Sequence, residues 1–144
     1  MSPSNPSSLP IKPAVDTKLH IDYEWWNRSE DDLRVYLISH LPVEQRDRLQ
    51  SIKEDRLIDY IDPITAEVTP MDELGTLLRQ ASQDPDFINS QISLVDCVFR
   101  VFLKNNNTPL SSLELADITE RPASLILKTL SGRRIYRGIR PILG

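Results

Sequence analysis

The sequence predicts a mainly α fold with a small β component (α+β). Two observations support this class: amphipathic stretches with helix-start signals recur along the chain, and strand-like alternation is confined to short stretches. A length of 144 residues and an apolar content of 40% are sufficient for one domain, or for two small units that share a core. We expect a disordered tail at residues 1–18, an acidic helical segment with short strands at 19–91, and a basic unit at 92–144.

The tail prediction follows from residues 1–18, which are rich in Ser and Pro, carry few apolar anchors and show no periodicity. Order is predicted to begin at Leu19, because LHIDYEWW alternates in the manner of a half-buried strand. An extended arm would show the same alternation.

The two tryptophans of the chain are adjacent in this stretch. Neighbouring side chains of a strand point to opposite faces, so Trp25 and Trp26 cannot both enter one core layer. Trp26 shares its face with Asp22 and Glu24, and is therefore predicted to be exposed as an anchor for a protein partner. The alternative is a tryptophan that the chain's own tail or helices cover.

The acidic segment continues with two predicted helices. Ser29 is the expected cap of the first, with Asp32 as its capping-box partner, and Pro42 ends or restarts it. Residues 43–53 predict a second helix that is more exposed, because few of its residues are apolar.

A hairpin and a third helix are predicted next. Residues 56–68, RLIDYIDPITAEV, favour a hairpin with its turn at Asp62 and Pro63, although a continued helix fits the pattern too. Thr69 is the expected cap of the following helix and Pro70 its first residue. The apolar stripe of this helix is Leu74, Leu77, Leu78 and Ala81.

Residues 92–104, ISLVDCVFRVFLK, predict a helix at the centre of the core. The stretch is apolar almost all round, and Asp96, Arg100 and Lys104 form one polar line at a spacing of four. Cys97 lies on this helix and is the single cysteine of the chain. We expect it to be a buried, unreactive thiol.

Two short helices are predicted after this central helix. Ser111 and Glu114 have the spacing of a capping box at the start of the first. The second is expected to begin at Pro122 and to end at Gly132, as a left-handed cap. Two short helices joined by three or four residues form a helix-turn-helix arrangement.

Over residues 92–144, about a third of the chain, the sequence resembles the winged helix-turn-helix superfamily. The resemblance consists of a Glu-Leu-Ala start followed by two branched apolar residues at the expected spacing, which are Glu114, Leu115, Ala116, Ile126 and Leu130. The sequence departs from the pattern at Glu120, where many members carry a glycine in the turn. No particular family within the superfamily is indicated.

This resemblance implies a recognition helix at residues 122–130 and a wing formed by RRIYRGIRPIL. The wing is expected to bend at Arg137 and Gly138, and Pro141 places its last strand at a sheet edge. The residues expected to pack inward are Ile135, Ile139 and Leu143. A plain terminal ribbon with solubilising arginines would have the same composition.

Charge is divided unequally along the chain. Residues 19–96 contain 7 basic and 17 acidic residues, whereas residues 97–144 contain 8 basic and 3 acidic ones. A positive patch attracts polyanions whatever the total charge, which is -4. The predicted nucleic-acid-binding residues are Arg121, Ser124, Lys128, Arg133, Arg134, Arg137 and Arg140.

These residues favour phosphate contacts, because the predicted recognition helix contains no Asn, Gln or Arg to read base edges. We therefore expect a DNA-binding or DNA-associated regulatory protein with weak sequence readout. The acidic half would recruit a protein partner or repel DNA. The alternative is a non-enzymatic adaptor that uses the winged helix and Trp26 to contact proteins.

Other classes of function have little support. There is no phosphate-binding glycine loop, nucleophile elbow or paired Cys motif, so we expect neither an enzyme nor a cofactor. His20 and His40 lack a second ligand at a familiar spacing, so no metal site is expected. The first residues do not resemble a secretory signal and no apolar run reaches bilayer length, so we expect a cytoplasmic protein without a membrane partner. Its oligomeric state is left open.

Overall fold

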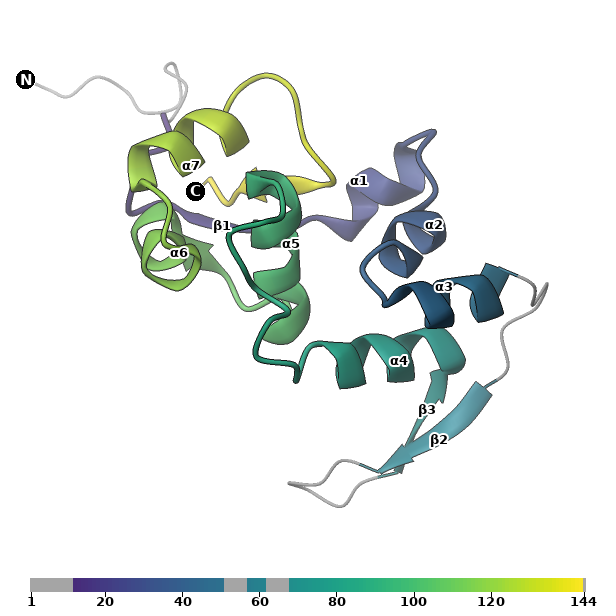
Figure 1. Ribbon diagram of the computed structural model, residues 1–144. Helices are drawn as coiled ribbons and strands as arrows, with labels where there is room; N and C mark the ends of the chain where they lie inside the picture. Colours follow the sequence, from purple (N-terminus) through teal and green to yellow (C-terminus); the bar gives the residue numbers. More distant parts are fainter. Residues whose placement is uncertain (1–11, 51–56, 62–67, 144) are drawn as a thin grey trace, which may run out of the picture. The chain divides into compact units, whose positions relative to one another are not determined.

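The computed structural model describes residues 12–50, 57–61 and 68–143 (Figure 1). It confirms the mainly α class with a small antiparallel β component. The chain divides into two units: residues 1–28 with 88–144 form unit 1, and residues 29–87 form unit 2. The structure thus groups residues 19–28 with the carboxyl-terminal part of the chain. Most of the predicted tail, residues 1–11, lies outside the described residues.

Unit 1 is built around one central helix. Its elements are β1 (Lys18–Ile21), α1 (Tyr23–Arg28), α5 (Leu94–Lys104), β4 (Leu110–Ser111), α6 (Ser112–Thr119), α7 (Ala123–Leu130) and β5 (Ile139–Pro141). Helix α5 begins at the cap Ser93, whose side chain accepts a hydrogen bond from the Asp96 N–H. Its Cys97, Val98 and Phe99 are fully buried, which confirms the predicted core helix and the buried thiol.

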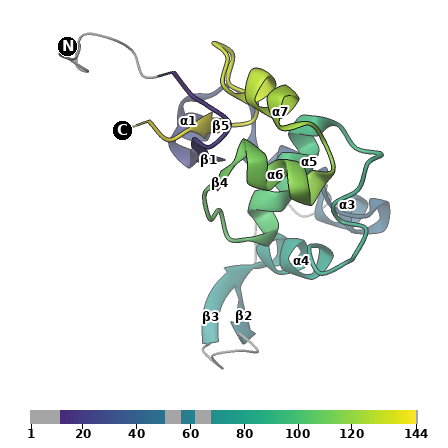
Figure 2. The ribbon, with the colours of Figure 1, turned by 90° about the vertical axis from the view of Figure 1, so that its left-hand side faces the viewer.

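The sheet of unit 1 has the strand order β4-β1-β5, with both pairs antiparallel (Figure 2). The amino-terminal strand is therefore the central one. Asn107 extends its pairing, because the Asn107 side chain accepts from the Ile21 N–H at 2.8 Å and donates to the Ile21 carbonyl at 2.9 Å. The two residues of β4 pair with Lys18 and Leu19, and at Ile21 the Asn107 amide makes the hydrogen bonds that a longer β4 would make.

The strand predicted at LHIDYEWW ends early, at Ile21. Asp22 accepts a hydrogen bond from the Glu24 N–H at 3.0 Å, as a helix cap does, and Tyr23–Arg28 forms α1. The interpretation of Trp26 as an exposed anchor is therefore wrong and the alternative of a covered tryptophan is confirmed, because its place in α1 turns it into the core of unit 1. Trp26 is 4% exposed and packs edge-to-face on Phe99 at 6.3 Å between ring centroids.

Unit 2 contains three helices and a hairpin within its described residues. The elements are α2 (Leu33–Ile38), α3 (Val43–Gln50), β2 (Leu57–Ile61), β3 (Val68–Asp72) and α4 (Glu73–Ala81). Helix α2 is capped by Asp32 and not by Ser29, because the Asp32 carboxylate accepts from the Val35 N–H. Buried Ile38, Leu41, Leu49, Leu74 and Leu77 form its core, with Leu78 and Ala81 of the predicted stripe packed against them.

The predicted hairpin is present as the antiparallel pair β2 and β3. Its returning strand extends through Asp72, so Thr69 and Pro70 lie in β3 and do not start the helix. Because Thr69 and Pro70 pair with β2, they form strand although their sequence is typical of a helix start, and α4 begins at Glu73. The predicted turn at Asp62 and Pro63 lies outside the described residues.

Candidate nucleic-acid interface

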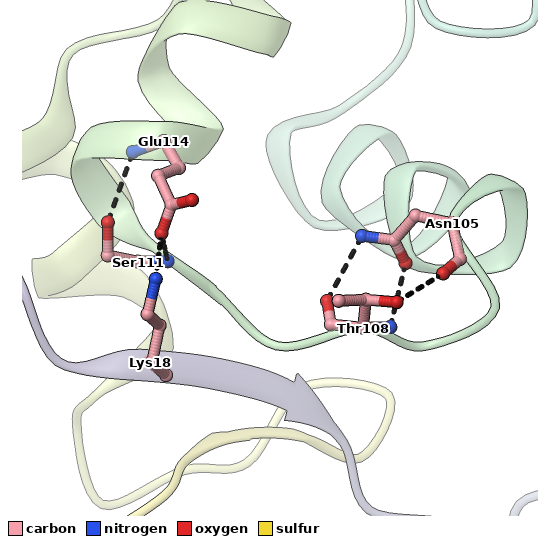
Figure 3. Close-up of polar contacts among 5 residues, drawn as sticks. All are labelled: Lys18, Asn105, Thr108, Ser111 and Glu114. Carbon is pink, nitrogen blue, oxygen red and sulfur yellow. Dashed lines mark hydrogen bonds and ion pairs between the residues drawn. The ribbon is translucent and has the colours of Figure 1, made fainter.

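Helix α6 begins with the predicted capping box. The Ser111 hydroxyl accepts from the Glu114 N–H at 3.2 Å, and Glu114 Oε1 accepts from the Ser111 N–H at 3.0 Å (Figure 3). Lys18 of β1 donates to the same carboxylate oxygen. The Lys18 ammonium, followed by the Ser111 N–H, lowers the pKa of Glu114 from its ordinary value of 4.5. The start of α6 is thereby tied to the central strand.

The turn between α6 and α7 consists of residues 120–122. Glu120 adopts the left-handed conformation, with φ 57° and ψ 36°, and its N–H donates to the Ala116 carbonyl. This is the backbone geometry for which glycine is favoured in such turns. Glu120 thus adopts a backbone conformation that glycine adopts without strain. Pro122 is the cap of α7 and not its first residue, because its ψ of 133° is extended.

The end of α7 differs from the prediction. Ser131 is the C-cap, with φ -115°, and its N–H donates to Leu127 O at 3.0 Å. Gly132 is therefore not a left-handed cap, and its φ is not positive. Positive φ values occur instead at Arg137 (55°) and Gly138 (77°), where the bend was predicted.

The segment after α7 does not form a two-stranded wing. Residues 131–138, here named the arginine loop, lead from α7 to β5 (Figure 1), and one bridge joins Tyr136 to Ile139. The partner of β5 is β1, which leaves β5 at the sheet edge predicted from Pro141. Ile139 is fully buried and Ile135 half-buried, as expected. Leu143 was predicted to pack inward but is 49% exposed, because it follows the last paired residues of the strand.

Four of the predicted nucleic-acid-binding residues are exposed on α7 and the arginine loop. Ser124 and Lys128 lie on the exposed side of α7, and Arg133 and Arg134 follow in the loop. The Arg134 guanidinium lies 5.2 Å from the centre of the half-buried Tyr136 ring, a cation–π distance. In the part of the chain that the structure describes, no ion pair involves Lys128, Arg133 or Arg134.

The other three predicted residues make contacts within unit 1. Arg121 donates to the Ile92 carbonyl and is half-buried. Arg140 forms an ion pair with Asp22 at 3.4 Å. Arg137 is half-buried, and its carbonyl accepts from the Trp26 indole N–H at 3.0 Å. The candidate surface therefore has three well-exposed cations.

Trp26 and Asp22 have a role at this surface that the sequence did not predict. Trp26 contacts Arg137 and Asp22 contacts Gly138, the last two residues of the arginine loop. More than a hundred residues of sequence separate the partners in each contact. Trp26 reaches this contact from within α1. The available signal was Asp22 as a helix cap directly after a short strand.

Exposed apolar side chains lie on helices α6 and α7. Leu113 and Ile118 of α6 are 50% and 44% exposed, and Leu125 of α7 is 47% exposed. Leu125 is adjacent in sequence to Ser124, on the exposed side of α7. The surface thus combines cations with apolar groups, and Asp117 and Glu120 add negative charge on the α6 side.

The charge division along the sequence follows the two units. Unit 1 contains 11 basic and 7 acidic residues, a balance of +4, and unit 2 contains 6 basic and 14 acidic residues, a balance of -8. The described residues contain no group of three or more His, Cys, Asp or Glu that could hold a metal ion. Among the described helices, none has the length and apolar character needed to cross a membrane.

Comparison of the chain with models of known protein families, with curated proteins and with solved structures found no match. Inferences about its function therefore depend on the geometry and charge of the described residues.

Proposed function

We propose that unit 1 contains a helix-turn-helix, α6 and α7, that binds DNA through backbone phosphates, with α7 and the arginine loop as the contact surface. The order α5, β4, α6, α7, β5 and the left-handed turn residue Glu120 support this assignment. The observation that carries the proposal is the exposure of Lys128, Arg133 and Arg134 on consecutive elements of the basic unit.

The proposed contact is to phosphates and not to base edges. The exposed side of α7 offers Ser124, Leu125 and Lys128, and of these Lys128 alone can make the paired hydrogen bonds that distinguish guanine. Phosphate contacts fix position without reading sequence. Binding should therefore depend weakly on sequence and strongly on salt.

The number of exposed cations sets the expected salt dependence. Each phosphate neutralised on B-DNA contributes about 0.9 to the slope of log K against log salt concentration. Lys128, Arg133 and Arg134 together predict a slope between about -2 and -3. Arg121 and Arg140 add little, because both already have partners in unit 1.

Fluorescence anisotropy of a labelled random-sequence duplex at several KCl concentrations tests the proposal. Arg133→Ala with Arg134→Ala should reduce the slope by about 2 units. Arg28→Ala with Lys104→Ala is the matched control, because it removes the same charge from exposed positions on α1 and α5 of unit 1. No binding by the native chain at low salt, or equal slopes for both double variants, would refute the proposal.

Exposed Leu113, Ile118 and Leu125 favour a second candidate function, a protein adaptor that docks a partner on α6 and α7. An adaptor predicts no affinity for duplex at low salt. For either function, the acidic unit 2, with a charge of -8, is proposed to recruit a protein partner or to repel DNA.

A further inference from the structure

The end of the arginine loop is held by a corner of the chain where β1 is followed by α1; this corner consists of residues 22–26. The Asp22 N–H donates to the Gly138 carbonyl at 2.8 Å, and the Trp26 indole N–H donates to the Arg137 carbonyl at 3.0 Å. The Asp22 carboxylate also pairs with Arg140 at 3.4 Å. Three polar contacts from one corner thus fix three of the four residues 137–140.

The fit between corner and loop is close at Gly138. This residue has φ +77°, and a Cβ there would lie 2.8 Å from Trp26 Nε1 and 3.1 Å from the Asp22 carbonyl oxygen. A side chain would therefore meet both backbone strain and a buried indole. Gly132, at the other end of the loop, has neither restriction, because its nearest atom to an added Cβ is Lys128 O at 3.8 Å.

The corner is itself rigidly supported. Trp26 packs edge-to-face on Phe99 of the central helix, and Trp25 packs on Trp26 at 5.0 Å between ring centroids. Asp22 caps α1 through its other carboxylate oxygen, which accepts from the Glu24 N–H. At the first residue of the arginine loop, the Ser131 N–H donates a hydrogen bond to the Leu127 carbonyl of α7. Arg133 and Arg134 thus lie between two anchored ends.

We infer that Asp22 and Trp26 are positioning residues for the arginine loop, and that phosphate binding by Arg133 and Arg134 requires the contacts of this corner with residues 137–140. The second half of this inference rests on the proposed function. Neither Asp22 nor Trp26 lies in α6 or α7. The proposed binding surface is therefore held in place by residues 22–26, which are far from it in the sequence.

Two glycine variants with identical charge test the inference. In Gly138→Ala the turn must shift away from Trp26, whereas Gly132→Ala should be accommodated in place. We expect trypsin to cleave Gly138→Ala after Arg133 and Arg134 about tenfold faster than the native chain, a change on the scale of left-handed backbone strain. Its affinity for random-sequence duplex should fall by about the same factor. Gly132→Ala should stay within about twofold in both measurements.

Trp26→Phe provides a milder second variant. It keeps an aromatic ring against Phe99 and removes the indole donor to Arg137. We expect faster cleavage in the loop while circular dichroism at the assay temperature remains that of the folded chain.

The outcomes separate the two proposals. Cleavage and affinity that are the same for Gly138→Ala and Gly132→Ala would overturn the inference. Faster cleavage with unchanged duplex affinity would overturn the requirement for phosphate binding. If the native chain does not bind duplex, the proposed function fails, and the cleavage comparison alone decides whether the corner positions the loop.

Discussion

Left-handed backbone at single residues determines several turns of this protein. Four described residues other than glycine have positive φ, and they are Asn106, Asn107, Glu120 and Arg137. Asparagine adopts this conformation readily, whereas Glu and Arg do so at the expense of local strain. The strained pair lies at the α6–α7 turn and beside Gly138, the two turns that shape the candidate surface.

Glu114 illustrates how one side chain joins two segments. It completes the capping box with Ser111 and binds Lys18 of the central strand. Since the pKa of Glu114 is lowered in the folded chain, the carboxylate stabilises the fold above the unfolded pKa, and this contribution is lost as pH falls through the folded pKa.

We predict that Glu114→Gln, which preserves an oxygen acceptor for the cap, destabilises the chain at neutral pH and does so progressively less as the pH is lowered below 4.5, the ordinary pKa of this carboxyl. Urea unfolding followed by tryptophan fluorescence measures this. Ser93→Ala at the start of α5 is the control, because loss of this cap hydroxyl should lower the free energy of unfolding by about 1 kcal/mol at neutral and at acidic pH alike. An equal loss for Glu114→Gln at neutral and at acidic pH would exclude the titration of this carboxylate as the cause.

Among the elements, the central strand β1 depends on contacts far away in sequence. β4 pairs with two of its residues, and Asn107 supplies both hydrogen bonds at Ile21. Asn106 has the same φ of 59° but is exposed. The two asparagines therefore share a left-handed φ and differ in the contacts of their side chains.

Asn107→Ala should lower the free energy of unfolding by about 2 kcal/mol more than Asn106→Ala, because it removes two hydrogen bonds that are partly buried. Both variants place alanine in left-handed backbone, so the backbone term cancels in the comparison. Fluorescence of Trp25 and Trp26 reports unfolding of unit 1 directly, since both lie in that unit. Equal losses for the two variants would show that Asn107 does not hold β1.

Which elements could be predicted from sequence depends on whether local signals decide them. The capping box at Ser111, the core helix around Phe99 and the bend at Gly138 are each indicated by residues adjacent in sequence, and the structure contains all three. The alternation of LHIDYEWW does not distinguish a strand from a strand followed by a short helix. Contacts with Arg137 and Phe99, over seventy residues away, decide that Trp26 is buried.

The candidate surface was predicted in part for the same reason. The sequence located the basic residues, but it could not reveal that Arg121 and Arg140 have partners at Ile92 and Asp22. These pairings reduce the expected number of phosphate contacts. The Arg140–Asp22 pair also connects the surface to the residue directly after β1, which the sequence-based division had placed in the acidic segment.

For the whole molecule, the main feature is a basic unit with a charge of +4 joined to an acidic unit with a charge of -8. Opposite charge on two units permits attraction of nucleic acid by one and its repulsion by the other. Exposed charges separated by more than about 8 Å interact weakly at physiological ionic strength. A positive contact surface on unit 1 is therefore compatible with a negative total charge.

The central claim is that α7 and the arginine loop contact phosphates, and the most direct test is a titration of the ¹⁵N-labelled native chain with random-sequence duplex at low salt. Amide resonances are expected to shift at residues 124–137 and to return as KCl is added, while those of unit 2 remain unchanged. Shifts confined to other regions, or none at a duplex excess, would contradict the account.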